Sequence, residues 1–393
     1  MNLTIPLVSV VILRRDGARL QGTIDSALTQ TFSSIEIIVV ERARESDTPA
    51  LPAAVKYFRI ADESEGWNFG ASRALGEYVC FVLAGEELFP TYIEKCVFLA
   101  ESEDLGLCAS LVQPVERGPF RRGSRVSDTP SSQAVVIRKK AFQATTGYDV
   151  RISPSAQLSD LWTRLTKAGV RASVLPEVLV RTSENPEQAL GRPPATQTGR
   201  RPTILLAMPY LTVGGAEAVV SQLCRQLKAL GFRLFVVTTK PEKQNQGDTS
   251  SWFEEWTAGI YHLPRFLDVS LWPAFIYYLI DQHSVAAIWQ LGSDFVYDLL
   301  PRIRELFPQI VVVDQLFNPV GHTANYLKYG NLIDHVVAEH TGMKDWLLQH
   351  GVPDENISVI PNGVNLDWYS PQPRIDWRTR QPRLADAVRS ACG

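Results

Sequence analysis

The chain has 393 residues, of which 45% are hydrophobic and 21% are charged, and its formal net charge is -3. This composition is that of a globular protein and excludes wholesale disorder, and the length favours two domains over one. Nucleic-acid-binding proteins usually carry a basic surplus, so we expect no nucleic-acid partner. The five cysteines are far apart and form no C-x-x-C pair. Their spacing argues against a zinc site and favours the reducing cytoplasm.

Three apolar, β-branched runs in the first half of the chain predict strands, at residues 8–13, 35–40 and 78–82. Polar, helix-compatible stretches such as residues 17–30 separate these runs. The alternation is typical of βαβ units on a parallel sheet. We therefore expect a first α/β domain over residues 1–187.

A polar segment at residues 184–202 follows, with four prolines and no apolar periodicity. Its composition predicts an exposed linker, which we place at residues 188–202. The βα alternation then returns, so we assign residues 203–372 to a second α/β domain. Residues 373–393 are polar, arginine-rich and without pattern, which predicts a loose tail or the stump of something longer. The predicted strands of the second domain are residues 203–207, 234–238, 286–290, 310–314 and 335–338, and its predicted crossover helices include residues 216–230 and 341–350.

The longest apolar run, residues 271–280, is shorter than the about 18 residues that a membrane-spanning helix needs. No charged-then-apolar leader precedes the first predicted strand. We therefore expect a soluble protein of the cytoplasm, with contact to the inner face of the membrane as an open alternative. The aromatic residues of the run suit a buried helix face or a membrane surface, and burial is the simpler interpretation.

The first domain resembles family 2 glycosyltransferases of the GT-A fold over residues 5–185. The strings that carry the resemblance are VSVVI, SALTQTF, IEIIVVE, GEYVCFV followed by Pro90, GYD at 147–149, DLWTRL at 160–165 and LPEVLV at 175–180. The resemblance implies a nucleotide-sugar donor, bound at the carboxyl ends of the strands. In that family, acidic residues after the second strand hold the nucleotide. Glu41 occupies the first such position, whereas Arg42 stands where a second acid is usual.

The metal and acid–base positions of this family are poorly preserved. The metal motif should be two aspartates one residue apart, because a divalent cation prefers hard oxygen ligands. The matching residues 83–86 read Leu-Ala-Gly-Glu, so Glu86 is the candidate ligand for Mg²⁺ or Mn²⁺, or else part of a solvated loop. The acidic pair expected before DLWTRL aligns with Gln157 and Leu158, and leucine cannot accept a proton. Asp160 is an acid–base remnant or a residue that caps its helix. We expect a domain that keeps the fold and has lost or weakened metal-dependent transfer.

In the second domain, the strand TILLAMP leads into YLTVGGAEAVVSQLCRQLKALG. Gly214 and Gly215 open a helix whose first backbone N–H groups are unpaired, and such helix starts favour anions. Here the glycines resemble the GG-A-E opening of family 4 glycosyltransferases, which have the GT-B fold, and the match extends through FVVTT to IPNGV at 360–364. The resemblance implies that Gly214 and Gly215 bind the donor phosphate. A glycine pair that only forms a turn is the alternative.

His322 follows the predicted strand VVVD in the string DQLFNPVGHT. A histidine in the corresponding loop of many family 4 members faces the reacting centre, so the resemblance implies a catalytic role for His322 beside the acceptor. A structural loop histidine is the alternative. GT-B enzymes bind the sugar nucleotide chiefly with a second lobe, and residues 374–393 are too few to form one. Either a longer native chain or another subunit supplies that lobe, or it is absent altogether.

Together these features predict two Rossmann-like domains with mainly parallel sheets, the first GT-A-like and the second like the N-terminal lobe of GT-B. The expected function is transfer of a sugar from a nucleotide-sugar donor to a glycan or lipid-linked acceptor in surface polysaccharide synthesis. No cofactor is expected for the second domain. The alternative is a non-catalytic binding or scaffold protein. An oxidoreductase is disfavoured because no G-x-G-x-x-G lies between a strand and a helix.

Overall fold

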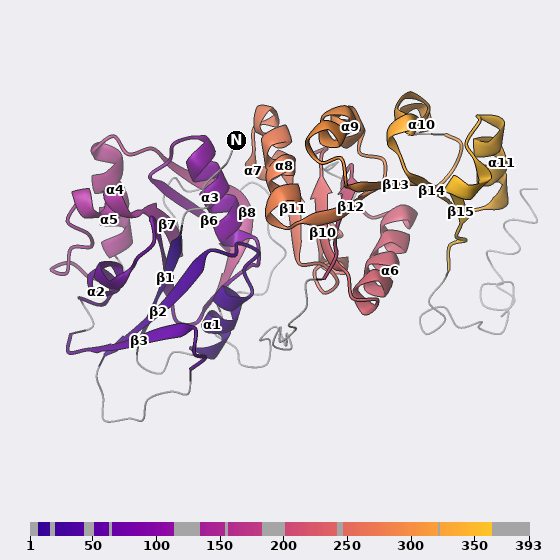
Figure 1. The fold of residues 1–393 in the computed structure, drawn as a ribbon. Helices are drawn as coiled ribbons and strands as arrows, with labels where there is room; N and C mark the ends of the chain where they lie inside the picture. The colour runs from indigo at the N-terminus through magenta and orange to yellow at the C-terminus, as the bar shows by residue number, and fades with distance from the viewer. Residues whose placement is uncertain are drawn as a thin grey trace, which may run out of the picture.

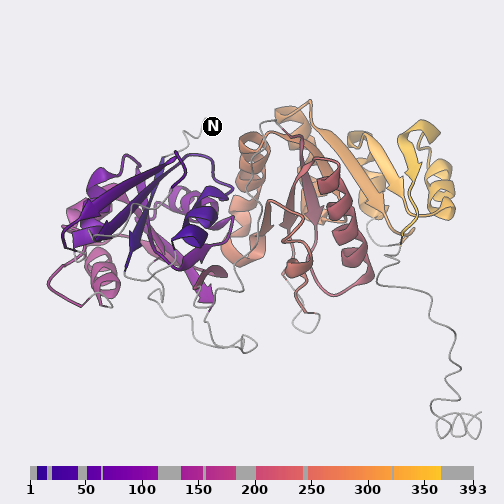
Figure 2. The same ribbon diagram turned by 90° about the horizontal axis from the view of Figure 1, so that it is seen from below.

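The computed structural model describes residues 7–15, 20–42, 51–62, 65–113, 134–153, 156–182, 201–241, 247–320 and 323–363. The chain forms two α/β units, each built on its own sheet, and Figures 1 and 2 show the two units side by side. The prediction of two α/β domains with mainly parallel sheets is confirmed. Most of the predicted linker and the whole predicted tail lie outside the described residues.

Within the described residues, the first sheet has eight strands in the order β3-β2-β1-β4-β7-β6-β8-β5. Only β5 and β7 run antiparallel to their neighbours, so the other six strands end at one common edge. The strands are β1 (Val8–Arg14), β2 (Ile35–Arg42), β3 (Val55–Ile60), β4 (Tyr78–Leu83), β5 (Glu86–Leu88), β6 (Leu107–Gln113), β7 (Val135–Arg138) and β8 (Ala172–Thr182).

Helices cover both faces of the first sheet, which explains why strands such as β1 are apolar at nearly every position. The helices are α1 (Gln21–Leu28), α2 (Gly66–Arg73), α3 (Tyr92–Ser102), α4 (Lys139–Ala144) and α5 (Gln157–Lys167). Helices α1 and α3 pack on the face that includes Val10 and Ile12, and α2, α4 and α5 pack on the face that includes Val11 and Leu13. The sheet is therefore buried between two helical layers.

The second sheet has seven parallel strands in the order β11-β10-β9-β12-β13-β14-β15. From β9, the next strands β10 and β11 are added on one side of the sheet. The chain then crosses to the other side of β9, where β12 to β15 follow in order. The carboxyl ends of β9 and β12 therefore flank the point where a sheet of this kind binds ligands. The strands are β9 (Thr203–Met208), β10 (Arg233–Thr238), β11 (Gly259–His262), β12 (Val285–Gln290), β13 (Val311–Leu316), β14 (His335–Ala338) and β15 (Ile357–Val359).

The α-helices of the second unit are α6 (Gly215–Ala229), α7 (Leu263–Phe266), α8 (Trp272–Gln282), α9 (Asp294–Leu306), α10 (Thr323–Tyr329) and α11 (Thr341–Gln349). Single 3₁₀ turns are η3 (Ser250–Trp252), η4 (Val269–Leu271), η5 (Gly330–Leu332) and η6 (Asp354–Asn356). The apolar run at residues 271–280 forms most of α8, with Phe275, Ile276 and Leu279 buried. Among the described residues, no helix is long and apolar enough to cross a membrane.

Candidate functional sites at the two carboxyl edges

At the carboxyl edge of the first sheet, Glu41 is the next-to-last residue of β2 and lies opposite Arg14, which ends β1. The two side chains form an ion pair with 3.0 Å between Arg14 Nη1 and Glu41 Oε1. The hydroxyl of Tyr57, from β3, donates to the other carboxylate oxygen at 2.5 Å. Glu41 thus stands at the edge where the sequence places a donor site, but protein groups already bond both of its oxygens. A nucleotide would have to displace Arg14 or bind beside it.

The turn that follows β4 leads directly to Glu86, the first residue of β5. Gly85 has a φ of 99°, a left-handed conformation that favours glycine, and its N–H donates to Thr23 Oγ1 at 3.0 Å. The carboxylate of Glu86 folds back to accept the N–H of Leu83 at 2.8 Å, and the residue is only 5% exposed. Within the parts of the chain that the structure describes, no three histidine, cysteine or acidic residues gather as a metal-binding group. The residues around Glu86 therefore do not by themselves fit a divalent cation, which prefers six or more oxygen ligands.

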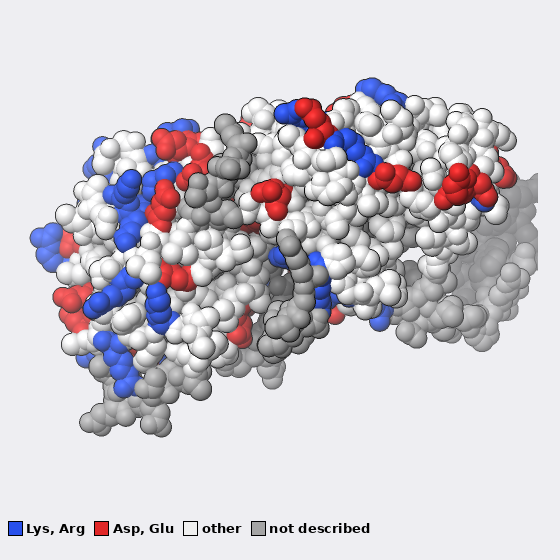
Figure 3. Space-filling model, viewed as in Figure 1, with Lys and Arg blue, Asp and Glu red and all other residues white. Residues whose placement is uncertain are grey.

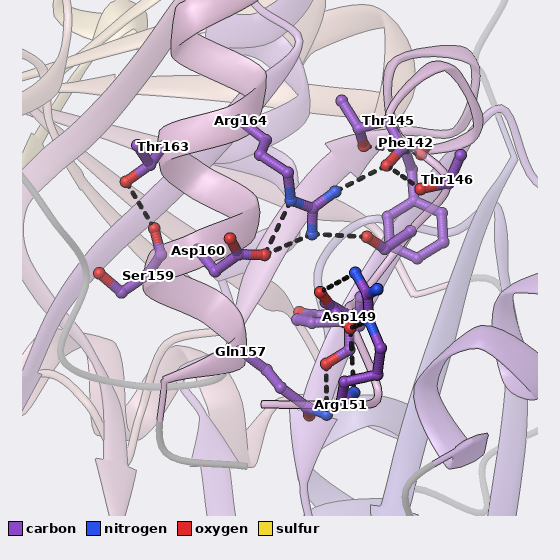
Figure 4. A network of polar contacts seen from close by, with 12 residues as sticks. Phe142, Thr145, Thr146, Asp149, Arg151, Gln157, Ser159, Asp160, Thr163 and Arg164 are labelled. Carbon is purple, nitrogen blue, oxygen red and sulfur yellow. Dashed lines mark hydrogen bonds and ion pairs between the residues drawn. The ribbon is translucent and has the colours of Figure 1, made fainter. Parts of the chain in front are cut away.

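Asp160 lies in the first turn of α5 rather than at the N-cap, which is Ala156. It accepts from Nε of Arg164 at 2.8 Å, and Nη1 and Nη2 of Arg164 donate to the carbonyls of Thr145 and Gly147 at 2.6 and 2.8 Å (Figure 4). Asp160 therefore holds the guanidinium that fastens the preceding turn to the helix. This placement gives Asp160 a positioning role that the sequence alone did not indicate.

The two residues that stand at the expected acid–base pair point away from solvent. Gln157 is buried and its Nε2 donates to the backbone carbonyl of Asp149 at 3.2 Å, and Leu158 packs in the core. The side chain of Asp149 is the nearby carboxylate that our sequence analysis missed. Arg151 donates to its two oxygens from Nε at 2.9 Å and Nη2 at 2.8 Å (Figure 4). These bonds hold the pKa of Asp149 well below its ordinary range.

The backbone around Asp149 is held from a second side by Asn68 of α2. Its amide donates to the carbonyl of Tyr148 at 2.8 Å and accepts the N–H of Tyr148 at 2.9 Å. Gly147, with a φ of 77°, has no room for a β-carbon because one would collide with Asn68. The motif GYD is thus a rigid turn, and an aspartate in such a turn could have been singled out from the sequence.

In the second sheet, Gly214 is the N-cap of α6 and Gly215 is its first residue. A β-carbon on Gly214 would collide with the carboxylate of Glu217, whereas one on Gly215 would meet nothing within 4 Å. The Glu217 carboxylate accepts bonds from its own N–H and that of Thr212, and burial raises its pKa. A side chain at position 214 would therefore displace the carboxylate of Glu217 from its present place. Gly215 faces open space, where the helix start could approach an anion.

Polar side chains gather just after the carboxyl ends of β10 and β12. These ends lie beside the point between β9 and β12 where the strand order of the second sheet reverses. Ser293 caps α9 by accepting the N–H of Val296 at 3.3 Å, and its hydroxyl lies 2.7 Å from that of Thr239. The next residues along each segment, Lys240 and Asp294, form an ion pair. Asp294 also accepts from Asn325 Nδ2 at 2.7 Å, which ties α10 to this edge. None of these residues was singled out from the sequence, because their segments meet only in the fold.

Asp314 lies in β13 and is fully buried. The hydroxyl of Tyr297 lies 2.8 Å from both of its carboxylate oxygens. Burial raises the pKa of Asp314 to about 7, although bonds from Tyr297 and the N–H of Gln315 favour ionisation. We therefore expect Asp314 to change charge in the neutral range, within the strand that precedes His322 in the chain. His322 itself lies outside the described residues.

A hollow of about 540 Å³ lies at the opposite edge of the second sheet. Its lining includes Asp334 and His335, where β14 begins, together with His350 and Asn356. It is therefore separate from the carboxyl edge. The charges on the face drawn in Figure 3 are of both signs and are intermixed over the first unit, so this face offers no single-sign track for a polyanion.

Two family profiles match different halves of the chain. Residues 8–152 match Glycosyl transferase family 2, and residues 213–368 match Glycosyltransferase Family 4. The uncharacterized glycosyltransferase YibD of Escherichia coli strain K12 is 30% identical over 117 residues, 27% of this chain and 33% of that protein. The uncharacterized glycosyltransferase RP339 of Rickettsia prowazekii is 35% identical over 110 residues, 26% of this chain and 35% of that protein.

The chain spans between 19% and 35% of the length of the curated relatives it matches. Among solved structures, S. aureus TarS aligns with a TM-score of 0.37 and 16% identity over 46% of this chain and 37% of that chain. The mannosyltransferase PcManGT from Pyrobaculum calidifontis, in complex with GDP-Man and Mn2+, aligns with a TM-score of 0.38 and 16% identity over 47% and 59% of the two chains.

Proposed function

Because this chain joins a domain of glycosyl transferase family 2 to a domain of Glycosyltransferase Family 4, we propose that it transfers a sugar from a nucleotide-sugar donor to a glycan or lipid-linked acceptor. Surface polysaccharide synthesis, at the cytoplasmic face of a membrane, is the proposed setting. The observation that carries the proposal is the match of both halves to glycosyltransferase families, in sheets whose carboxyl edges each hold polar side chains.

The reaction is attack of an acceptor hydroxyl on the anomeric carbon, with a nucleoside diphosphate as leaving group. The leaving diphosphate needs electrostatic stabilisation, and both reactants need fixed positions. In the second domain, the open helix start at Gly215 suits the anionic group, and Lys240 stands at the same edge. His322 is our proposed catalytic residue beside the acceptor.

The first domain is proposed to contribute little metal-dependent transfer. Glu41 and Glu86 remain at the edge where a donor would bind, but both carboxylates already accept bonds from protein groups. Leu158 in the core leaves no acid–base group at the position where the family would have one.

A partner that supplies a second GT-B lobe would face the carboxyl edge of the second sheet. Three large apolar side chains are exposed in loops at this edge, Val213 at 62%, Val320 at 75% and Ile360 at 53%. They follow β9, β13 and β15 respectively, so they surround the same edge. A lobe docked on this edge would cover these apolar side chains.

The test is a turnover assay on the full chain with mixed nucleotide sugars, with and without Mn²⁺. We expect donor hydrolysis or transfer that needs no metal, and at least a hundredfold loss in His322→Ala. Gly215→Glu, which adds a like charge at the helix start, should raise the donor KM while the matched control Ala229→Glu, at the exposed last residue of α6, should not. Metal-independent turnover unchanged in His322→Ala would remove the catalytic assignment.

A non-catalytic binding or scaffold protein is the second candidate, and the buried Gln157 and Leu158 of the first domain favour it. A scaffold would bind nucleotide sugars or glycans without turning them over at any metal concentration. Calorimetric titration beside the turnover assay separates the two candidates, because binding without turnover supports only the scaffold.

A further inference from the structure

Helix α3 of the first unit is buried on more sides than a surface helix should be. All nine residues from Tyr92 to Ala100 are buried, including Glu94 and Lys95 at 1% exposure each. A helix that covers one face of a sheet normally keeps a polar side toward water. Here α8 of the second unit covers that side. The ring of Phe98 packs edge-on against Phe275 at 4.7 Å between centroids and lies 5.4 Å from Tyr278.

Glu94 is the centre of a polar cluster that spans the two units. One carboxylate oxygen accepts from Thr31 of its own unit at 2.6 Å and from the hydroxyl of Tyr261 in β11. The other accepts from Tyr278 of α8 at 3.0 Å and lies 2.9 Å from Nε2 of His283. Burial opposes ionisation of Glu94, but the bonds from His283, Thr31 and Tyr261 outweigh it and lower the pKa. The second unit thus supplies three of the four groups that bond this buried carboxylate.

Lys95, the next residue, places a buried cation at the same boundary. Its Nζ lies 2.8 Å from Glu177 Oε2 of β8, and the side chains of both partners are buried. The ammonium also lies 5.7 Å from the ring centroid of Tyr261 and 5.0 Å from that of Phe266, both in the second unit. Tyr261 therefore bonds Glu94 through its hydroxyl and contacts Lys95 through its ring. A one-turn shift of α3 along α8 would take Glu94 away from three of its four partners and Lys95 away from both rings.

We propose that the two glycosyltransferase-type units form one permanent body, in which the face made by β11, α7 and α8 is a dedicated docking surface for α3 and Glu94 sets its register. The apolar rings give the association its strength. The buried carboxylate gives it specificity, because any other register would bury a charge without donors. This inference is independent of whether either unit transfers a sugar. It also means that a further partner has to approach the second unit elsewhere than at α7 and α8.

The test cuts the covalent link after folding. A recognition site for a specific protease is inserted between residues 190 and 197 of the full chain, the folded protein is cleaved, and the products are examined by size-exclusion chromatography with light scattering. We expect a single species with the mass of the whole chain at micromolar concentration and in high salt. Two separate folded fragments would overturn the proposal.

Variants test the role of Glu94 in the same cleaved protein. Glu94→Gln replaces an acceptor oxygen by an NH₂ that faces two donors, so we expect the dissociation constant of the fragments to rise at least about tenfold. Glu305→Gln is the matched control, because among its described contacts Glu305 pairs only with the exposed Arg302 on α9. Should Glu94→Gln fail to fold, Tyr278→Phe removes one donor and keeps the ring, and a smaller rise is expected. Unchanged association in the folded Glu94 variant, or in Tyr278→Phe where that replaces it, would refute the register assignment.

Discussion

At the scale of single residues, several positions that match a family motif contact a neighbouring group of the protein. Gly214 makes room for Glu217, and Gly147 makes room for Asn68. Asp160 holds Arg164, and Glu86 closes its own turn. A residue that matches a family motif can therefore have a local structural role that the motif does not reveal.

The role of Gly214 can be tested by adding a single methyl group. Gly214→Ala should lower the free energy of unfolding by about 1 kcal/mol, because Glu217 must leave the backbone amides that it now bonds. Gly215→Ala, whose β-carbon meets no atom, should be neutral or slightly stabilising. Urea denaturation measures both. In a Glu217→Ala background the cost of Gly214→Ala should disappear, and an equal cost in both backgrounds would contradict the explanation.

Asp314 should make stability depend on pH in the neutral range. Burial raises its pKa to about 7 in the folded state, so the folded chain holds a proton that the unfolded chain has released. Stability from this group is complete below the unfolded pKa and is lost as the pH rises through about 7. Asp314→Asn keeps an oxygen for Tyr297 and cannot ionise. The free energy of unfolding of this variant, relative to that of the native chain, should therefore increase by about 2 kcal/mol or more between pH 5 and pH 8 in denaturant titrations. A difference that is constant with pH would contradict this.

At the scale of elements, the strand and helix pattern was predicted well where periodicity was strong. The predicted helices at residues 216–230 and 341–350 correspond to α6 and α11 within one residue at each end. The antiparallel strands β5 and β7 were not predicted, because short strands of three and four residues carry too little alternation. The polar cluster around Ser293 was also missed, since its members come from three separate segments.

Helix α5 should depend on Arg164 as a clamp. Arg164→Lys keeps the charge, but its compact ammonium lacks the planar fork with which Arg164 reaches Asp160 and two carbonyls at once. We therefore expect the free energy of unfolding to fall by about 1–2 kcal/mol and amide exchange at residues 145–149 to become faster. Arg151→Lys is the control, because Arg151 is 85% exposed and pairs only with Asp149 among its described contacts. It should change stability by less than about 0.5 kcal/mol. Exchange unchanged in Arg164→Lys would show that the turn does not need the clamp.

At the scale of the whole molecule, the chain is one body with two sheets rather than two domains on a tether. Its apolar run at residues 271–280 indicated a buried helix face, but the partner of that face could not be predicted, since nothing in α8 alone specifies α3. The continuous burial of α3 and its adjacent Glu94 and Lys95 are visible only when both units are present.

The contact between α3 and the docking surface made by β11, α7 and α8 should weaken in acid. The folded pKa of Glu94 is lowered below its ordinary value of 4.5, so its stabilising effect is present above about pH 4.5 and is lost as the pH falls through the folded pKa. The groups that face it are Thr31, Tyr261, Tyr278 and His283. The cleaved chain should separate in this acid range, as monitored by light scattering, and Glu94→Gln should flatten the dependence. Separation with the same pH profile in both proteins would exclude Glu94 as its cause.

Tyr261 contacts both Glu94 and Lys95 of α3, and this limits how the two units can be exchanged between related proteins. Suppose that the second unit is replaced by a homologous one, joined at the connecting segment. Both sheets would keep all their strands, but α3 would then face a surface that lacks the partners Tyr261 now provides. A chimera of that kind would leave a charged, aromatic-rich patch open to solvent and prone to precipitate. A folded chimera would have to take α3 from the same parent as β11, α7 and α8. These four elements would therefore have to be exchanged together.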